Sequence, residues 1–198
     1  MPTRNAYIAI TAIFLVIFGF QLASLFEPKW VQFKGPEPYH TEANYGLFQK
    51  CSTLTGDCRR FPQKSWGDCD HDKSSFGEKS GRWVNLCLEW RVAAGVAVAS
   101  SIVGLWVFAL LGTVLYTGDR WLANGWKYVL GPVGIFAGLQ IVAMGLIAHT
   151  TQNSAMFAYH HYGPSFIFTN VSWGLAAVLA VGVALFARYG TQGSIALE

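Results

Sequence analysis

Four long apolar runs alternate with polar segments along the chain. They cover residues 7–26, 92–116, 130–150 and 165–187, and none carries an Asp, Glu, Lys or Arg in its interior. A helix on the surface of a soluble protein shows a polar face with a period of about 3.6 residues, and these runs do not. Each run is long enough to cross a bilayer, which takes roughly 17–25 residues. The pattern therefore predicts a mainly α-helical membrane protein with four membrane-spanning helices.

The first run has an alternative interpretation as a cleaved signal peptide, since Arg4 precedes it and Ala23 and Ser24 are small. We favour a retained span, because the run exceeds the roughly 7–15 apolar residues of a signal-peptide core. Trp30 also follows the run where an interfacial anchor belongs, and with Trp90 it predicts an aromatic belt at that membrane surface.

The charged residues are concentrated in one polar segment. The chain of 198 residues is 53% hydrophobic and 13% charged, against about 25% charged in a soluble domain. Ten of the fourteen Lys and Arg residues and nine of the eleven Asp and Glu residues fall between Glu27 and Arg91. The net charge of +3 forms no continuous basic stripe, so nucleic acid is not an expected partner. The expected partners are membrane lipids and, through the polar segment 27–91, another membrane protein or a second copy of the chain.

Four spans place both termini on one side of the membrane. Basic residues flank the spans on the predicted inner side, at Arg4, Arg120, Lys127 and Arg188. The cysteines all lie in segment 27–91, which favours an oxidising, lumenal or extracellular location for it. We expect a multi-pass plasma-membrane protein, a single domain over residues 1–198, with both termini cytoplasmic. Its inner loop would cover residues 117–129, and its tail residues 188–198.

The extracellular segment predicts a small disulfide-braced sheet. Alternating apolar and polar residues indicate strands at 30–33, 45–50, 58–61 and 82–88, with a polar loop over 62–81. Four cysteines allow three pairings. We favour Cys51–Cys58, which closes a hairpin, together with Cys69–Cys87, whose loop-closure contribution is about 3 kcal/mol. A zinc site is disfavoured because no pair has the C-x₂₋₄-C spacing.

The apolar runs also contain polar and small residues with expected roles. Gly134 and Gly138 have the small-xxx-small spacing that packs membrane helices, within the bundle or in a homodimer. Interhelical hydrogen bonds are expected from Gln21, Gln140 and Asn170. Arg91 is expected to bond carbonyls or carboxylates of the sheet, Glu89 among them. Three histidines lie near the outer ends of the last two spans, and we favour solvated or capping roles over metal or haem ligation for them: His149, His160 and His161.

A set of residues in fixed order resembles the pattern of the claudin, peripheral myelin protein and epithelial membrane protein superfamily. That pattern is a Trp, then Gly-Leu-Trp, then two cysteines in the first outer loop, and often an Arg where the second span begins. The matching residues here are Trp30, Gly46, Leu47, Phe48, Cys51, Cys58 and Arg91. The third and fourth spans add Phe136–Leu139, Tyr162–Phe166 and Trp173. The resemblance implies a left-handed four-helix bundle that carries a small extracellular antiparallel sheet.

Departures from that pattern favour a divergent, fungal or invertebrate member over a junction-forming claudin. Phe48 replaces the Trp, the pair Cys69 and Cys87 is additional, and the chain lacks a Tyr-Val ending. We expect no catalytic residue, cofactor or metal, and a non-enzymatic role in cell contact, membrane organisation or as an auxiliary subunit of a channel or enzyme. The alternative is a claudin-type paracellular barrier or pore, for which the balanced charges of the outer segment indicate no selectivity. A redox or haem enzyme is disfavoured, because the chain has no C-x-x-C motif and its histidines lie at the membrane interface instead of facing each other from inside the helices.

Overall fold

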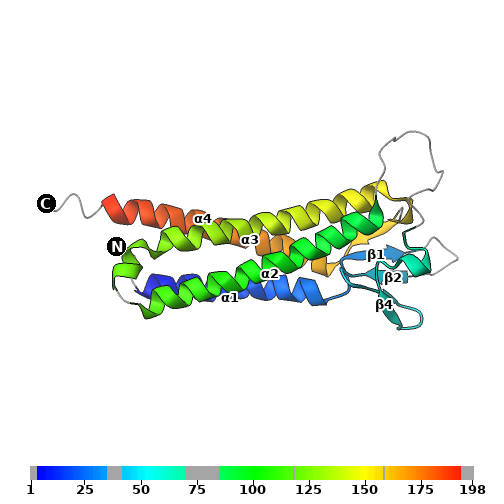
Figure 1. The fold of residues 1–198 in the computed structure, drawn as a ribbon, viewed down its shortest axis with the longest axis horizontal. Helices are drawn as coiled ribbons and strands as arrows, with labels where there is room; N and C mark the ends of the chain where they lie inside the picture. Colours follow the sequence, from blue (N-terminus) through cyan, green and yellow to red (C-terminus); the bar gives the residue numbers. More distant parts are fainter. Residues whose placement is uncertain (1–3, 35–41, 70–84, 118, 158, 193–198) are drawn as a thin grey trace.

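The computed structural model describes residues 4–34, 42–69, 85–117, 119–157 and 159–192. Four long helices run side by side, and a small sheet lies at one end of them (Figure 1). The start of α1, the end of α4 and the connection between α2 and α3 all lie at the opposite end. The helices are α1 (Arg4–Phe26), α2 (Leu86–Tyr116), α3 (Asp119–Asn153) and α4 (Pro164–Gln192). A four-helix arrangement with a small sheet confirms this level of the predicted fold class.

All four helices are long and apolar enough to cross a membrane, over Arg4–Phe26, Leu86–Tyr116, Gly125–Asn153 and Pro164–Leu185. The helices extend beyond the predicted spans, because hydropathy detects membrane length and not helix length. The predicted inner loop over 117–129 was wrong for most of its length, since α3 already begins at Asp119. Likewise α4 continues to Gln192, into the predicted tail. Residues 193–198 lie outside the described part.

The sheet has five strands in the order β4-β3-β2-β1-β5, and all neighbours are antiparallel. Its strands are β1 (Val31–Lys34), β2 (Glu42–Tyr45), β3 (Gln49–Ser52), β4 (Cys58–Arg60) and β5 (His160–Tyr162). The predicted strand over 45–50 was wrong. Tyr45 ends β2 and Gln49 begins β3, because the chain turns at Gly46, whose N–H donates to the Gln49 carbonyl at 2.7 Å. The last strand, β5, comes from the connection between α3 and α4 and was not predicted.

The predicted strand over 82–88 was also wrong where the structure describes it. Helix α2 begins at Leu86, and Asn85 caps it, since the Asn85 Oδ1 accepts the Leu88 N–H at 3.0 Å. The buried side chains in the first turns of α2 are Leu86, Cys87 and Trp90. This is a helical spacing, but over so few residues it can be mistaken for the apolar–polar alternation of a strand. Residues 82–84 of this predicted strand lie outside the described part, and so do residues 70–81 of the predicted polar loop over 62–81. The described beginning of that loop contains a 3-10 turn, η1 (Lys64–Trp66).

Small residues let the helices approach closely, as expected, but they are not the residues predicted for α3. A buried row of small side chains on α2 consists of Ala93, Ala94, Ala97, Ser100, Ser101 and Gly104. At Gly104 a Cβ would lie 2.5 Å from the Phe18 ring of α1. Gly134 and Gly138 are exposed, and a Cβ on either would meet nothing within 4 Å. They therefore do not pack the helices of this chain against one another.

Removing the disulfide between Cys69 and Cys87 should lower the melting temperature of the purified protein. This bridge spans 18 residues of sequence and the hairpin bridge spans 7, so loop entropy assigns about 3 kcal/mol to the former and somewhat less to the latter. We expect the Cys69→Ser/Cys87→Ser variant to melt lower than the Cys51→Ser/Cys58→Ser variant, measured by tryptophan fluorescence in mild detergent. The reverse order would contradict this interpretation.

Candidate functional site

Two tryptophans fix the sheet on the helix ends. Trp30 and Trp90 are fully buried, so the predicted aromatic belt was wrong for both of them. The Trp30 Nε1 donates to the Ser24 carbonyl at 2.7 Å, and the Trp90 Nε1 donates to the Gly46 carbonyl at 3.2 Å. A buried indole N–H needs such an acceptor. The Trp90 bond therefore holds the turn at Gly46 above α2, and the Trp30 bond holds the start of the sheet against the end of α1.

The Gly-Leu-Phe sequence forms that turn. At Gly46 a Cβ would lie 2.7 Å from the Pro28 Cα, so glycine is required by the close approach of two backbone segments. Leu47 inserts into the core between sheet and helices, whereas Phe48 is 48% exposed. The Phe48 carbonyl also accepts the Phe61 N–H at 3.0 Å. Three of the residues that carry the family resemblance, Trp30, Gly46 and Leu47, therefore have structural roles.

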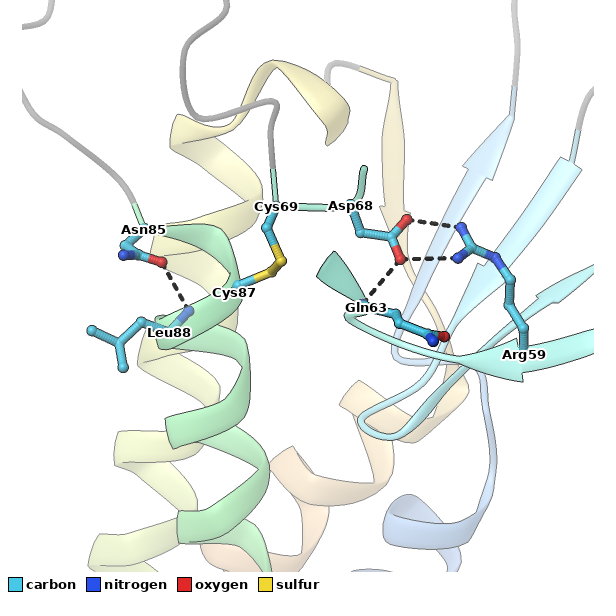
Figure 2. Close-up of a disulfide and its surroundings, with 7 residues drawn as sticks. All are labelled: Arg59, Gln63, Asp68, Cys69, Asn85, Cys87 and Leu88. Atoms are coloured by element: carbon cyan, nitrogen blue, oxygen red, sulfur yellow. Dashed lines mark hydrogen bonds and ion pairs between the residues drawn. A yellow bond between two sulfur atoms is a disulfide. The ribbon is translucent and has the colours of Figure 1, made fainter. Parts of the chain in front are cut away.

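Both predicted disulfides are present. Cys51–Cys58 joins the paired strands β3 and β4. Cys69–Cys87 joins the chain just after η1 to the first turn of α2 (Figure 2). Beside the second bridge, Asp68 is 4% exposed and accepts two hydrogen bonds from the Arg59 guanidinium, at 2.8 and 3.0 Å, and one from the Gln63 N–H at 3.1 Å. These bonds satisfy the buried carboxylate and join η1 to β4.

The same region perturbs two titratable groups of the sheet. The pKa of Tyr45 is raised from 10.0 to about 12, first by burial and then by the nearby Asp68 carboxylate, while the Arg59 charge opposes the rise. The pKa of Lys50 is lowered, first by burial and then by the Arg59 charge. The Lys50 Nζ lies 4.6 Å from the centre of the Tyr45 ring. The ammonium and the ring thus meet across neighbouring strands.

The predicted bond between Arg91 and Glu89 is not formed. The Glu89 Oε2 instead contacts the His149 Nδ1 at 3.0 Å and accepts the Thr150 hydroxyl at 2.7 Å, which joins α2 to α3. His160 contacts the Phe157 carbonyl through its Nδ1, and His161 is exposed. Within the described residues, no group of three or more His, Cys, Asp or Glu side chains is placed to hold a metal ion.

Of the three predicted interhelical amides, only Gln21 is confirmed. Its Nε2 donates to the Ala97 carbonyl of α2 at 3.4 Å. Asn170 instead donates to the Phe166 carbonyl of its own helix at 3.1 Å, so that prediction was wrong. Gln140 is fully buried, and neither polar atom of its side chain has a hydrogen-bond partner among the described residues.

We define the sheet module as the five strands, the described turns that join them, and η1. Its two most exposed large apolar side chains are Leu54 and Trp66. Leu54 lies in the turn between β3 and β4 and is 69% exposed, and Trp66 of η1 is 66% exposed. The Arg59 guanidinium lies 5.0 Å from the centre of the Trp66 ring, which orients the ring. Exposed apolar side chains held by a braced scaffold are typical of protein-binding surfaces.

A groove of about 800 Å³ separates the β3–β4 hairpin from the outer part of α2. We call it the arginine groove. It is lined by Leu47, Phe48, Gln49, Cys58, Arg59, Arg60, Phe61, Pro62, Arg91, Ala94, Gly95 and Val98. The sequence did not predict it, because its two walls come from segments about 30 residues apart that only the docked sheet brings together.

Comparisons with known proteins leave the family open. A scan against protein-family models and a search of curated proteins find no match for this chain. The function therefore has to be inferred from the geometry described above, with the resemblance in the sequence as a hypothesis beside it.

Replacing Gly46 with alanine should destabilise the sheet module by about 1–3 kcal/mol, the usual cost of overpacking. The added Cβ would collide with the Pro28 Cα, and a backbone atom cannot move aside by changing a side-chain rotamer. Gly134→Ala is the matched control, since its Cβ would meet open space on α3 and alanine favours the helix. Thermal unfolding in mild detergent should show a lower midpoint for Gly46→Ala only; equal midpoints would refute the close approach.

Replacing Tyr45 with phenylalanine should reduce the loss of stability at alkaline pH. The unfolded chain releases the tyrosine proton near its ordinary pKa of 10.0, and the folded protein holds it until about 12. The folded state therefore binds more protons in this window, and stability falls as pH rises. Relative to Tyr45→Phe, the wild type should lose about 1.4 kcal/mol per pH unit within it. Melting midpoints at about pH 9 and 11 measure the difference; parallel losses would contradict the burial of the hydroxyl.

Proposed function

We propose that this chain is a non-enzymatic, multi-pass plasma-membrane protein that binds a partner protein, or a second copy of itself, through its disulfide-braced sheet module. In this proposal the sheet faces the outside and both termini are cytoplasmic. The bundle with its small sheet is the architecture that the resemblance to the claudin superfamily implied, and that agreement supports a divergent claudin-like tetraspan protein. Cell contact, membrane organisation and service as an auxiliary subunit are the roles that fit.

Membrane insertion is supported by the outward faces of the helices. Large apolar side chains lie exposed along them, for example Ile102, Leu105 and Val178. A soluble protein rarely exposes continuous apolar surface of this extent, whereas lipid chains cover it at no cost in hydration. The four apolar runs contain no Asp, Glu, Lys or Arg, the residues whose charges mark a transport pathway in membrane helices.

The side of the membrane is supported by the disulfides. Both bridges lie in the sheet module or at the sheet-side end of α2, and such bonds persist in oxidising compartments. The start of α1 and the end of α4 lie at the end of the bundle opposite the sheet (Figure 1). An extracellular sheet therefore implies termini in the cytoplasm.

The observation that carries the binding role is the exposure of Leu54 and Trp66 on a rigid scaffold. The disulfides, the Arg59–Asp68 ion pair and the docking on α2 order this surface before any partner arrives, so that binding would cost little conformational entropy. The ionisable groups at the base of the sheet are used in structural contacts. Asp68 bonds Arg59, and Glu89 bonds His149 and Thr150. That use favours a scaffold over a catalytic centre.

A photo-crosslinking amino acid at position 54 tests the proposal in intact cells. We expect a discrete adduct with another membrane protein or with a second copy, identified by mass spectrometry. A second substitution, Trp66→Ser, should remove the adduct, and Tyr159→Ser, which changes another exposed aromatic residue near β5, should leave it. Adducts with lipid alone, or an adduct insensitive to Trp66→Ser, would count against this surface.

A further inference from the structure

The arginine groove contains two guanidinium groups without an acidic partner. Arg59 is neutralised by its ion pair with Asp68. Arg60 and Arg91 are exposed, and neither guanidinium makes a hydrogen bond or ion pair within the described part of the chain. None of the residues that line the groove is an Asp or a Glu. The groove is therefore a positively charged recess that an anion would fit.

Below these groups the groove is apolar. Its floor on α2 consists of Ala94, Gly95 and Val98. Gly95 deepens the floor, since a Cβ there would meet nothing within 4 Å. From Arg91 the spacing of four and three residues continues through Gly95 and Val98 to the exposed Ile102 and Leu105. Residues at this spacing lie on one face of a helix, so an apolar track leads from Arg91 along the span.

We infer that the arginine groove binds an acidic phospholipid of the leaflet on the sheet side, with the phosphate at Arg60 and Arg91 and an acyl chain on the track from Gly95 to Leu105. Guanidinium groups bond phosphate oxygens through paired, charge-assisted N–H donors. A volume of about 800 Å³ lies within the roughly 300–1,000 Å³ of small-molecule sites. This inference rests on the membrane insertion proposed above. An acidic peptide fits less well, because the floor would lie in lipid.

Native mass spectrometry of the purified full chain in detergent tests it, with phosphatidylglycerol and phosphatidylcholine of identical acyl chains as probes. We expect preferential binding of phosphatidylglycerol. The Arg60→Gln/Arg91→Gln variant should weaken phosphatidylglycerol binding by about tenfold or more, as the loss of charge-assisted hydrogen bonds predicts. Phosphatidylcholine binding should change less, because the choline cation of that lipid is already repelled by the two guanidinium groups. The matched control is Lys34→Gln/Lys64→Gln, which removes two exposed charges of the sheet module outside the groove and should change nothing.

A second variant tests the acyl-chain track without changing any charge. Gly95→Leu fills the floor of the groove and should weaken phosphatidylglycerol binding, whereas Gly112→Leu, at an equally open glycine of the same helix, should not. Both substitutions favour helix formation, so folding is preserved. Loss of binding in the arginine variant but not in Gly95→Leu would indicate a site for the phosphate group alone and overturn the inference, as would equal binding of the two lipids.

Alkaline carbonate extraction separates failure of this inference from failure of the proposed function. Retention of the protein in the membrane pellet, combined with equal binding of both lipids, would overturn the lipid site alone. Release into the supernatant would overturn membrane insertion, and the lipid site with it. Retention with preferential phosphatidylglycerol binding supports both.

Discussion

The hydrogen bond from the buried Trp90 indole to the Gly46 carbonyl determines how the sheet sits on the helices. Trp90 lies in the first part of α2, under the sheet, where water has no access. An indole N–H in that position needs an acceptor, and the turn between β2 and β3 supplies it. The turn can come this close only because Gly46 has no Cβ to meet Pro28. Leu47 then fills the core and Phe48 is left at the surface, which sets one wall of the arginine groove.

Further contacts join the sheet to the other helices. Strand β5 pairs with β1 and precedes α4 directly, and the Gly163 N–H donates to the Trp30 carbonyl at 2.9 Å. The Ser165 hydroxyl at the start of α4 donates to the Glu27 carbonyl at 3.0 Å. The disulfide between Cys69 and Cys87 adds the η1 segment to α2. Because the sheet is held at several points, a partner that bound it would meet a preformed surface.

The sequence predicted features that depend on local pattern and missed those that depend on close approach. The helices followed from the length of the apolar runs, and the disulfides from cysteine spacing around a hairpin. The predicted strand over 45–50 was wrong because the apolar–polar alternation does not reveal the turn between Gly46 and Gln49, nor the close approach of Pro28 to that turn. Trp90 was wrongly predicted to lie in an aromatic belt, because a tryptophan at the end of an apolar run gives the same sequence pattern whether it faces lipid or packs under a sheet. For Gly134 and Gly138 the local pattern itself misled, because their spacing suits helix packing but none of the described helices lies against them.

The central claim is that an oxidised sheet module lies outside a membrane-crossing bundle whose ends face the cytoplasm. Labelling of intact cells with a membrane-impermeant maleimide, before and after an impermeant reductant, tests it most directly. The account predicts no labelling of the four cysteines before reduction, and labelling from outside after it. Labelling without reductant that requires permeabilised cells would place reduced thiols in the cytosol and contradict the account.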